Sequence, residues 1–181
     1  LVEHAAKILA ESSPGLVIDV GTGTGAIPLA LARKHPTFQY LGLDISPDAL
    51  ALAAENASAS GSAPNEGTKV EWKKNDLLEG ITGSAVLITA NLPYLTPAEI
   101  EFAEPEVRHD PRPALEGGTD GLDLIRRLIP QAAKLAKSLL LECGPDQAQK
   151  VATLAREAGF TNVAVHPDLT QRPRILEARH S

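Results

Sequence analysis

Short runs of β-forming residues alternate with helical patterns along most of this 181-residue chain. Parallel strands need crossover connections long enough to hold a helix, so this alternation predicts an α/β fold with helices on both faces of a mostly parallel sheet. Seven segments have the composition of strands, namely 16–20, 40–43, 70–73, 85–89, 138–141, 163–166 and 175–178. Helical patterns occupy 2–9, 27–34, 47–59, 122–135 and 147–158. A chain of this length suits one domain, which we expect to span residues 1–181.

Two of the predicted helices carry recognisable ends. Ser46 is a suitable N-cap for the helix that starts at Pro47, where the missing N–H of proline costs nothing. Gly159 follows the last helix and is typical of a helix C-terminus. The segments 58–68 and 95–121 lack such patterns. The first is expected to be a surface connection, and the second is long enough to suggest a functional loop.

Composition excludes several classes of protein. The chain carries 17 Lys and Arg against 23 Asp and Glu, a net charge of −6, so it has no general attraction to nucleic-acid phosphates. A single cysteine, Cys143, forms no internal disulfide, which favours a reducing, cytoplasmic location and a small buried thiol. No apolar run approaches the ~18 residues of a membrane-spanning helix. The five histidines show no paired ligand spacing, so we predict no metal site.

A glycine-rich segment, Asp19-Val20-Gly21-Thr22-Gly23-Thr24-Gly25-Ala26, follows the first strand and opens the first helix. Its residues 21–25, the glycine loop, permit a tight turn and let backbone N–H groups approach a ligand closely. The spacing is Gly-x-Gly-x-Gly and not the Gly-x-Gly-x-x-Gly of pyrophosphate binders, so the loop need not hold a phosphate. A plain strand-to-helix turn is the alternative interpretation.

Two acidic residues follow the next strands at the same predicted edge of the sheet. Asp44 lies 19 residues after Gly25, where a carboxylate accepts hydrogen bonds from the ribose hydroxyls of a nucleoside. Asp76 could accept from the exocyclic amine of adenine while Leu77 packs on the purine face. A helix-capping aspartate at 44 and a surface turn at 76 are the structural alternatives.

The apolar run 85–90 ends in four residues that we call the tetrapeptide, Asn91-Leu92-Pro93-Tyr94. These residue types are suited to binding a planar nitrogen nucleophile. A buried Asn91 amide oxygen and the Leu92 carbonyl can accept the two N–H hydrogens of an amide, which exposes the nitrogen lone pair, while the Tyr94 ring covers the amide plane. Pro93 biases Leu92 toward extended geometry and aims its carbonyl. A turn at the end of a strand, with a packed tyrosine, would have a similar sequence and is the alternative interpretation.

The glycine loop, Asp44, Asp76 and the tetrapeptide together resemble the seven-stranded S-adenosylmethionine-dependent methyltransferases, which have a Rossmann-like fold. This resemblance implies the strand order 3-2-1-4-5-7-6 with an antiparallel last strand. It also implies S-adenosyl-L-methionine as cofactor, with S-adenosyl-L-homocysteine as product. The implied catalytic residues are Asn91, Leu92, Pro93 and Tyr94. The implied cofactor-binding residues are Gly21, Thr22, Gly23, Thr24, Gly25, Asp44, Ile45, Asp76, Leu77 and Asn91.

The tetrapeptide resembles the Asn-Pro-Pro-Tyr signature of methyltransferases that act on planar amino or amide nitrogens, with leucine in place of the first proline. The downstream residues are similar to those of the protein-(glutamine-N5) methyltransferases of peptide chain release factors. They are Glu104-Pro105-Glu106-Val107, His109-Asp110-Pro111, Ala114-Leu115, Gly117-Gly118 and Asp120-Gly121-Leu122, with Asp168-Leu169 and 174–179 near the end. The resemblance implies that the acceptor is the glutamine of the Gly-Gly-Gln loop of a release factor.

That family normally has a small helical domain before the catalytic one. This chain starts at Leu1 without a methionine and directly in a helical pattern, so we expect the helical domain to be absent here and an upstream portion to be missing.

Residues 95–125 hold eight acidic side chains and two arginines, which favours a basic protein surface as partner over nucleic acid. The alternatives are a nucleic-acid amino methyltransferase acting on adenine N6 or cytosine N4, and a cofactor-binding module that has lost transfer.

Overall fold

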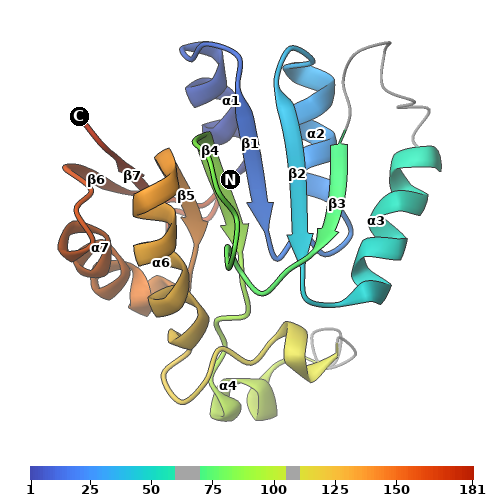
Figure 1. The fold of residues 1–181 in the computed structure, drawn as a ribbon. Helices are drawn as coiled ribbons and strands as arrows, with labels where there is room; N and C mark the ends of the chain where they lie inside the picture. Colours follow the sequence, from blue (N-terminus) through green and yellow to red (C-terminus); the bar gives the residue numbers. More distant parts are fainter. Residues whose placement is uncertain (60–69, 105–110) are drawn as a thin grey trace.

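The computed structural model describes residues 1–59, 70–104 and 111–181. Figure 1 shows the sheet of this described part with helices packed on both sides. Its seven strands are β1 (Leu16–Val20), β2 (Gln39–Asp44), β3 (Val70–Lys74), β4 (Ala85–Asn91), β5 (Ala136–Glu142), β6 (Asn162–Pro167) and β7 (Pro173–Arg179). The strand order is β3-β2-β1-β4-β5-β7-β6, and β7 runs antiparallel to both neighbours. The predicted fold class and strand order are therefore confirmed.

Five of the described helices lie close to their predicted positions, namely α1 (Val2–Ala10), α2 (Ala26–Lys34), α3 (Pro47–Ala59), α6 (Asp123–Leu135) and α7 (Ala148–Glu157). The structure adds a helix that was not predicted, α4 (Pro97–Phe102), and the short 3-10 turns η1 (Arg112–Ala114) and η2 (Pro145–Gln147). Ser46 caps α3 as predicted, since its Oγ accepts from the Ala49 N–H at 3.3 Å. Gly159 adopts the left-handed φ of +105° after α7.

Alternation along the strands places apolar side chains on both faces of the sheet. In β1, Val17 belongs to a cluster beneath α1 and α2, whereas Ile18 belongs to the cluster beneath α6 and α7. In β4, Leu87 and Ile88 divide in the same way. Two-sided burial explains why these strands read as nearly continuous apolar runs. None of the described helices has both the length and the apolarity needed to cross a membrane.

The described part of the connection 95–121 contains regular structure that was not predicted from the sequence. Thr96 and Glu99 form a capping box at the start of α4. Leu95 forms an isolated parallel bridge with Glu116, which brings the two ends of the connection together. Residues 60–69 and 105–110 lie outside the described residues. They include most of the predicted connection 58–68 and part of the segment that carries the family resemblance.

Candidate functional site

The glycine loop, Asp44 and the tetrapeptide meet at one edge of the sheet. This follows from the topology, because β1 lies between β2 and β4 and parallel to both, and each of these groups lies at or directly after the carboxyl end of its strand. Ligands of open α/β sheets bind at such an edge, where the order of strands reverses. The lower half of Figure 1 shows this edge, with α4 below the end of β4.

The glycine loop has a conformation that depends on its glycines. Gly21, Gly23 and Gly25 have φ values of +69°, +53° and +76°, in the left-handed region that L side chains rarely adopt. The Thr22 N–H donates to the Leu43 carbonyl at 2.9 Å, so the end of β2 supports the loop. A Cβ at Gly23 would meet no atom within 4 Å, which leaves open space beside the loop.

A buried carboxyl group lies beneath the loop. Asp19 is 1% exposed and accepts hydrogen bonds from Thr22 Oγ1 at 2.7 Å and from Thr89 Oγ1 at 2.6 Å. Burial raises the pKa of Asp19 to about 6 despite these hydrogen bonds. Asp19 was not predicted as a site residue, although an acidic side chain inside the apolar run 16–20 is a detectable signal.

Asp44 connects the loop to the start of α3. Its Oδ2 accepts from the Gly23 N–H at 2.9 Å, and its Oδ1 accepts from the Ser46 N–H at 2.9 Å. Asp44 is not itself the cap of α3: Ser46 is the N-cap, and Asp44 accepts from the N–H of that residue. Ile45, the next residue, is 64% exposed and offers an apolar surface beside the carboxylate.

Leu77 is more enclosed than a surface turn would be, whereas Asp76 is partly exposed and paired. Asp76 Oδ2 accepts from Arg127 Nη2 of α6 at 2.7 Å. Leu77 has a φ of +50° and is 6% exposed, within the core cluster beneath α6 and α7. The Arg127 contact joins residues 51 positions apart, so no local pattern could have indicated it.

All four residues of the tetrapeptide line a cavity of about 740 Å³, a volume typical of ligand sites. Asn91 is exposed at this cavity, so the expectation of a buried amide was wrong: Asn91 is the last residue of β4, still paired with β5 but beyond the buried part of the strand. Leu92 is 4% exposed and packs toward the glycine loop, since a Cβ at Gly21 would lie 2.8 Å from Leu92 Cδ2. The leucine thus joins the two halves of the candidate site.

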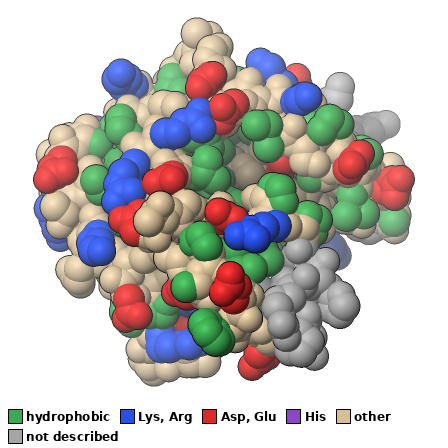
Figure 2. Space-filling model, turned by 90° about the horizontal axis from the view of Figure 1, so that it is seen from below, with side chains coloured by type: hydrophobic (Ala, Val, Ile, Leu, Met, Phe, Trp, Pro, Cys, Tyr) green, Lys and Arg blue, Asp and Glu red, His purple; other side chains and the backbone are tan. Residues whose placement is uncertain are grey.

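The other walls of the cavity come from α4, η1, η2 and the β6–β7 hairpin. Besides the tetrapeptide, the lining residues are Leu95, Glu99, Ala103, Glu104, Ala114, Leu115, Gly144, Pro145, Asp146, Gln147, Arg172 and Arg174. These walls carry both signs of charge, and Figure 2 shows red and blue side chains intermixed with green ones on this face of the molecule. The glycine loop is outside this lining, so the cavity corresponds to the acceptor half of the predicted site.

The acidic residues of the connection are partly neutralised by neighbours. Glu116 pairs with Arg112 at 2.6 Å, and Asp120 pairs with Arg126 at 2.5 Å. The Arg126 guanidinium lowers the pKa of Asp120 to about 2. Three charged residues counted in the prediction, Glu106, Arg108 and Asp110, lie outside the described residues.

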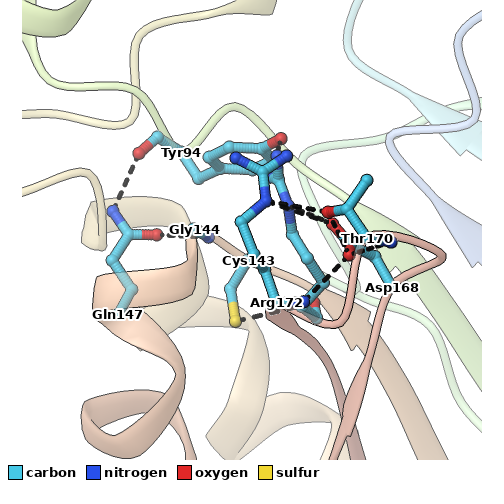
Figure 3. A network of polar contacts seen from close by, with 8 residues as sticks. Tyr94, Cys143, Gly144, Gln147, Asp168, Thr170 and Arg172 are labelled. Atoms are coloured by element: carbon cyan, nitrogen blue, oxygen red, sulfur yellow. Dashed lines mark hydrogen bonds and ion pairs between the residues drawn. The ribbon is translucent and has the colours of Figure 1, made fainter.

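Tyr94 is the centre of a polar network at the cavity, shown in Figure 3. The Tyr94 carbonyl accepts from Gln147 Nε2 at 2.8 Å, and the same Gln147 accepts from the Gly144 N–H at 2.9 Å. The phenol oxygen accepts from Arg174 Nη1 at 2.6 Å. Gln147 and Arg174 were not predicted as site residues, because they join the site only through tertiary contacts.

Cys143, at the end of β5, is fully buried, which confirms the prediction of a small buried thiol. Burial raises its pKa to about 11, so the group is a neutral thiol at physiological pH. Its backbone N–H donates to the Arg174 carbonyl at 3.0 Å, which ties β5 to the start of β7.

Within the described part of the chain, one cluster of possible metal ligands forms between α1, β6 and β7, outside the lining of this cavity. His4, His166 and Glu177 have ligand atoms within 4.8 Å of one another. His166 Nε2 lies 2.9 Å from Glu177 Oε2, and Arg179 Nε lies 2.6 Å from Glu177 Oε1, so protein groups already partner both carboxylate oxygens. The prediction that the chain holds no metal stays a prediction.

Comparison with known proteins assigns the family. The family model described as "Methyltransferase domain" matches residues 17–109, which span β1 to β4 with the glycine loop and the tetrapeptide. The chain belongs to this methyltransferase family. The solved structure of a ribosomal protein L11 methylase from Lactobacillus delbrueckii subsp. bulgaricus resembles the domain with a TM-score of 0.67 at 20% identity, covering 99% of this chain and 77% of that one. The family and the fold imply S-adenosylmethionine as the cofactor of this methyltransferase domain.

Relatives named release factor glutamine methyltransferase are similar to this methyltransferase domain over most of its length. The relative from Deinococcus radiodurans is 44% identical over 168 residues, which cover 91% of this chain and 58% of that protein. The relative from Cereibacter sphaeroides is 40% identical over 167 residues, which cover 90% of this chain and 59% of that protein. The resemblance predicted from the sequence is confirmed, and the chain spans about three fifths of the length of these relatives.

Proposed function

We propose that this domain transfers a methyl group from S-adenosylmethionine to the side-chain amide nitrogen of a glutamine, in the Gly-Gly-Gln loop of a peptide chain release factor. The observation that carries the proposal is the cavity at the end of β4, which all four residues of the tetrapeptide line. The names of the relatives support a release factor as the protein that supplies the glutamine.

The glycine loop and its surroundings fit the cofactor. Asp44 would accept from the ribose hydroxyls, and the exposed Ile45 would cover one face of the adenine. Asp76 binds Arg127 through Oδ2, and we assign its other oxygen to the exocyclic amine, with Leu77 beside the ring. Thr22, Thr24 and the three glycines would surround the amino-acid part. When bound, S-adenosylmethionine supplies an electrophilic methyl group on a sulfonium sulfur.

The residues of the tetrapeptide hold the acceptor amide. Asn91 Oδ1 and the Leu92 carbonyl accept its two N–H hydrogens, so the nitrogen lone pair points away from both toward the methyl group. Holding the reacting atoms ~3 to 3.5 Å apart contributes most of the rate enhancement in such a displacement. The nitrogen gains the methyl carbon, the carbon–sulfur bond breaks with its electron pair on sulfur, and one amide proton leaves to solvent. No covalent enzyme intermediate is required.

The proposal is tested by incubating the chain with radiolabelled S-adenosylmethionine and one acceptor at a time: a release factor, ribosomal RNA or DNA. Label on the Gly-Gly-Gln glutamine, located by peptide mapping, is the expected result. Label on nucleic acid alone would favour an adenine or cytosine amino methyltransferase. Cofactor binding without transfer to any acceptor would indicate a binding module.

A further inference from the structure

Tyr94 is held at both ends by residues that follow it in sequence by more than fifty positions. Gln147 holds its carbonyl at 2.8 Å, while Arg174 of β7 donates to its phenol oxygen at 2.6 Å. The guanidinium carbon also lies 5.5 Å from the centre of the ring, within the range of a cation–π contact. Backbone and side chain of Tyr94 are therefore constrained independently.

Arg174 is itself fixed by its neighbours. Its side chain is 21% exposed, and its Nε lies 3.5 Å from Asp168 Oδ2. Asp168 in turn accepts from the N–H groups of Thr170 at 2.8 Å and Arg172 at 3.0 Å, so the turn of the hairpin orients the carboxylate (Figure 3). The Thr170 hydroxyl and these N–H groups lower the pKa of Asp168 to about 2, so the carboxylate is ionised at neutral pH.

This arrangement matters for a ring that must cover an amide plane. A half-buried tyrosine needs a partner for its hydroxyl, and that partner sets the ring plane as well as satisfying the hydrogen bond. A guanidinium held between a carboxylate and a phenol is preorganised, so little rotamer freedom is lost when substrate arrives.

We propose that Arg174 is a positioning residue for methyl transfer: it fixes the Tyr94 ring in the orientation that receives the acceptor amide. The antiparallel strand β7 thereby completes the acceptor site at the end of β4. This inference rests on the proposed function. Arg174 acts through Tyr94, although it also lines the cavity.

The first test compares Arg174→Met with the unaltered domain in transfer to a release factor. We expect kcat to fall roughly 10- to 100-fold through misplacement of the ring, with the KM for S-adenosylmethionine almost unchanged. Arg174→Lys should recover part of the loss, since it restores a cation and a donor. Arg179→Met, in the same strand but paired with Glu177, is the matched control and should alter kcat by less than about threefold.

A double-mutant cycle separates the positioning role from direct substrate binding. In a Tyr94→Phe background the phenol oxygen is gone, so Arg174→Met should have little further effect on kcat. An equal loss from Arg174→Met in both backgrounds would assign Arg174 to the substrate and overturn the inference. An unchanged kcat in the single variant would also overturn it.

A second measurement needs no activity. The chain has two tyrosines, so in a Tyr40→Phe variant the phenolate absorbance reports Tyr94 alone. Burial raises the pKa of Tyr94, Arg174 lowers it and Glu142 raises it, so Arg174→Met should move the titration midpoint upward. An unchanged titration midpoint of Tyr94 would contradict the contact between Arg174 and the phenol oxygen. Absence of transfer by the unaltered domain would overturn the proposed function and the positioning role with it, whatever the titration shows.

Discussion

Asn91 and Leu92 are adjacent in sequence but differ in the burial of their side chains. The Asn91 side chain is exposed at the cavity, whereas the Leu92 side chain is buried in the core beneath α6 and α7. The related signature has proline at the position of Leu92. Here the leucine side chain lies next to Gly21 and adds a packing contact with the glycine loop. The backbone carbonyl that we propose as an acceptor of the amide hydrogens is present with either residue.

Replacing Asn91 by alanine tests the acceptor half of the site. Asn91→Ala removes the side-chain oxygen that is proposed to orient the amide, so kcat should fall roughly 100-fold or more. The affinity for S-adenosylmethionine, measured by calorimetry, should change far less. Asn162→Ala, an exposed asparagine of β6, is the control. Unchanged turnover of Asn91→Ala would remove Asn91 from its proposed role.

Replacing Asp44 tests the cofactor half. Asp44→Ala loses the proposed ribose contacts and the hydrogen bond from the Gly23 N–H, so the Kd for S-adenosylmethionine should rise at least about tenfold. Asp48→Ala, in the first turn of α3, removes a nearby negative charge without touching the loop contact and serves as control. Equal affinity in the unaltered chain and Asp44→Ala would contradict the assignment.

Asp19 should make folding stability depend on pH. Its pKa is about 6 in the folded state against 3.8 when exposed, so the folded state holds this proton more tightly. The free energy of unfolding should therefore decrease as pH rises from about 4 to 6, by an amount on the order of 3 kcal/mol, and then level off. Urea unfolding at several pH values should show this decrease in the unaltered chain and not in Asp19→Asn. The same decrease in both proteins would place its origin in another group.

At the scale of elements, the segment after the tetrapeptide packs its glycines against the backbone of the tetrapeptide. A Cβ at Gly117 would lie 2.6 Å from the Pro93 carbonyl oxygen, and a Cβ at Gly121 would collide with the Tyr94 carbonyl oxygen and with Gln147 Nε2. The glycines therefore permit a close approach that holds both carbonyls in place. The connection also returns to its starting point here, where Leu95 forms the isolated parallel bridge with Glu116.

Gly121→Ala tests that approach, with Gly80→Ala as a matched control. Both glycines have similar left-handed φ values, +73° and +68°, but a Cβ at Gly80 would meet no atom within 4 Å. Backbone strain should destabilise each variant by roughly 1 kcal/mol. Gly121→Ala should in addition displace Gln147 and lower kcat roughly tenfold or more. Equal kcat values in the two variants would show that the contact has no part in transfer.

At the scale of the whole molecule, two exposed apolar side chains lie close in sequence to residues that line the cavity. Phe102 of α4 is 89% exposed and directly precedes Ala103, which lines the cavity. Leu169 is 98% exposed in the hairpin turn that leads to Arg172, another lining residue. Because the proposed acceptor is a folded protein, its surface should cover side chains that a free glutamine would not reach.

Serine at these two positions should therefore weaken docking and leave chemistry intact. Phe102→Ser and Leu169→Ser should each raise the KM for the release factor up to roughly tenfold, with similar kcat and cofactor affinity. Leu52→Ser, a leucine of α3 that is 44% exposed, is the control. Steady-state kinetics with varied release factor measures the effect, and an unchanged KM in both variants would locate docking elsewhere.

Local pattern was enough to place the seven strands, the principal helices and the glycine loop, because side-chain period, caps and turn residues act over a few neighbouring positions. It also located Asp44 and the tetrapeptide at strand ends. It missed α4, because this helix has only six residues and lies in a segment rich in proline. It also misjudged the burial of Asn91, since burial depends on what surrounds the end of a strand.

The partners of these residues were settled by packing across the chain. Arg174 reaches Tyr94 across 80 positions, Arg127 reaches Asp76 across 51, and Thr89 reaches Asp19 across 70. Such contacts exist only once parallel strands align their ends and β7 turns back antiparallel beside β5. Sequence pattern therefore identified the groups that carry the chemistry, and the tertiary structure determined which side chains hold them, because long-range contacts leave no local period to read.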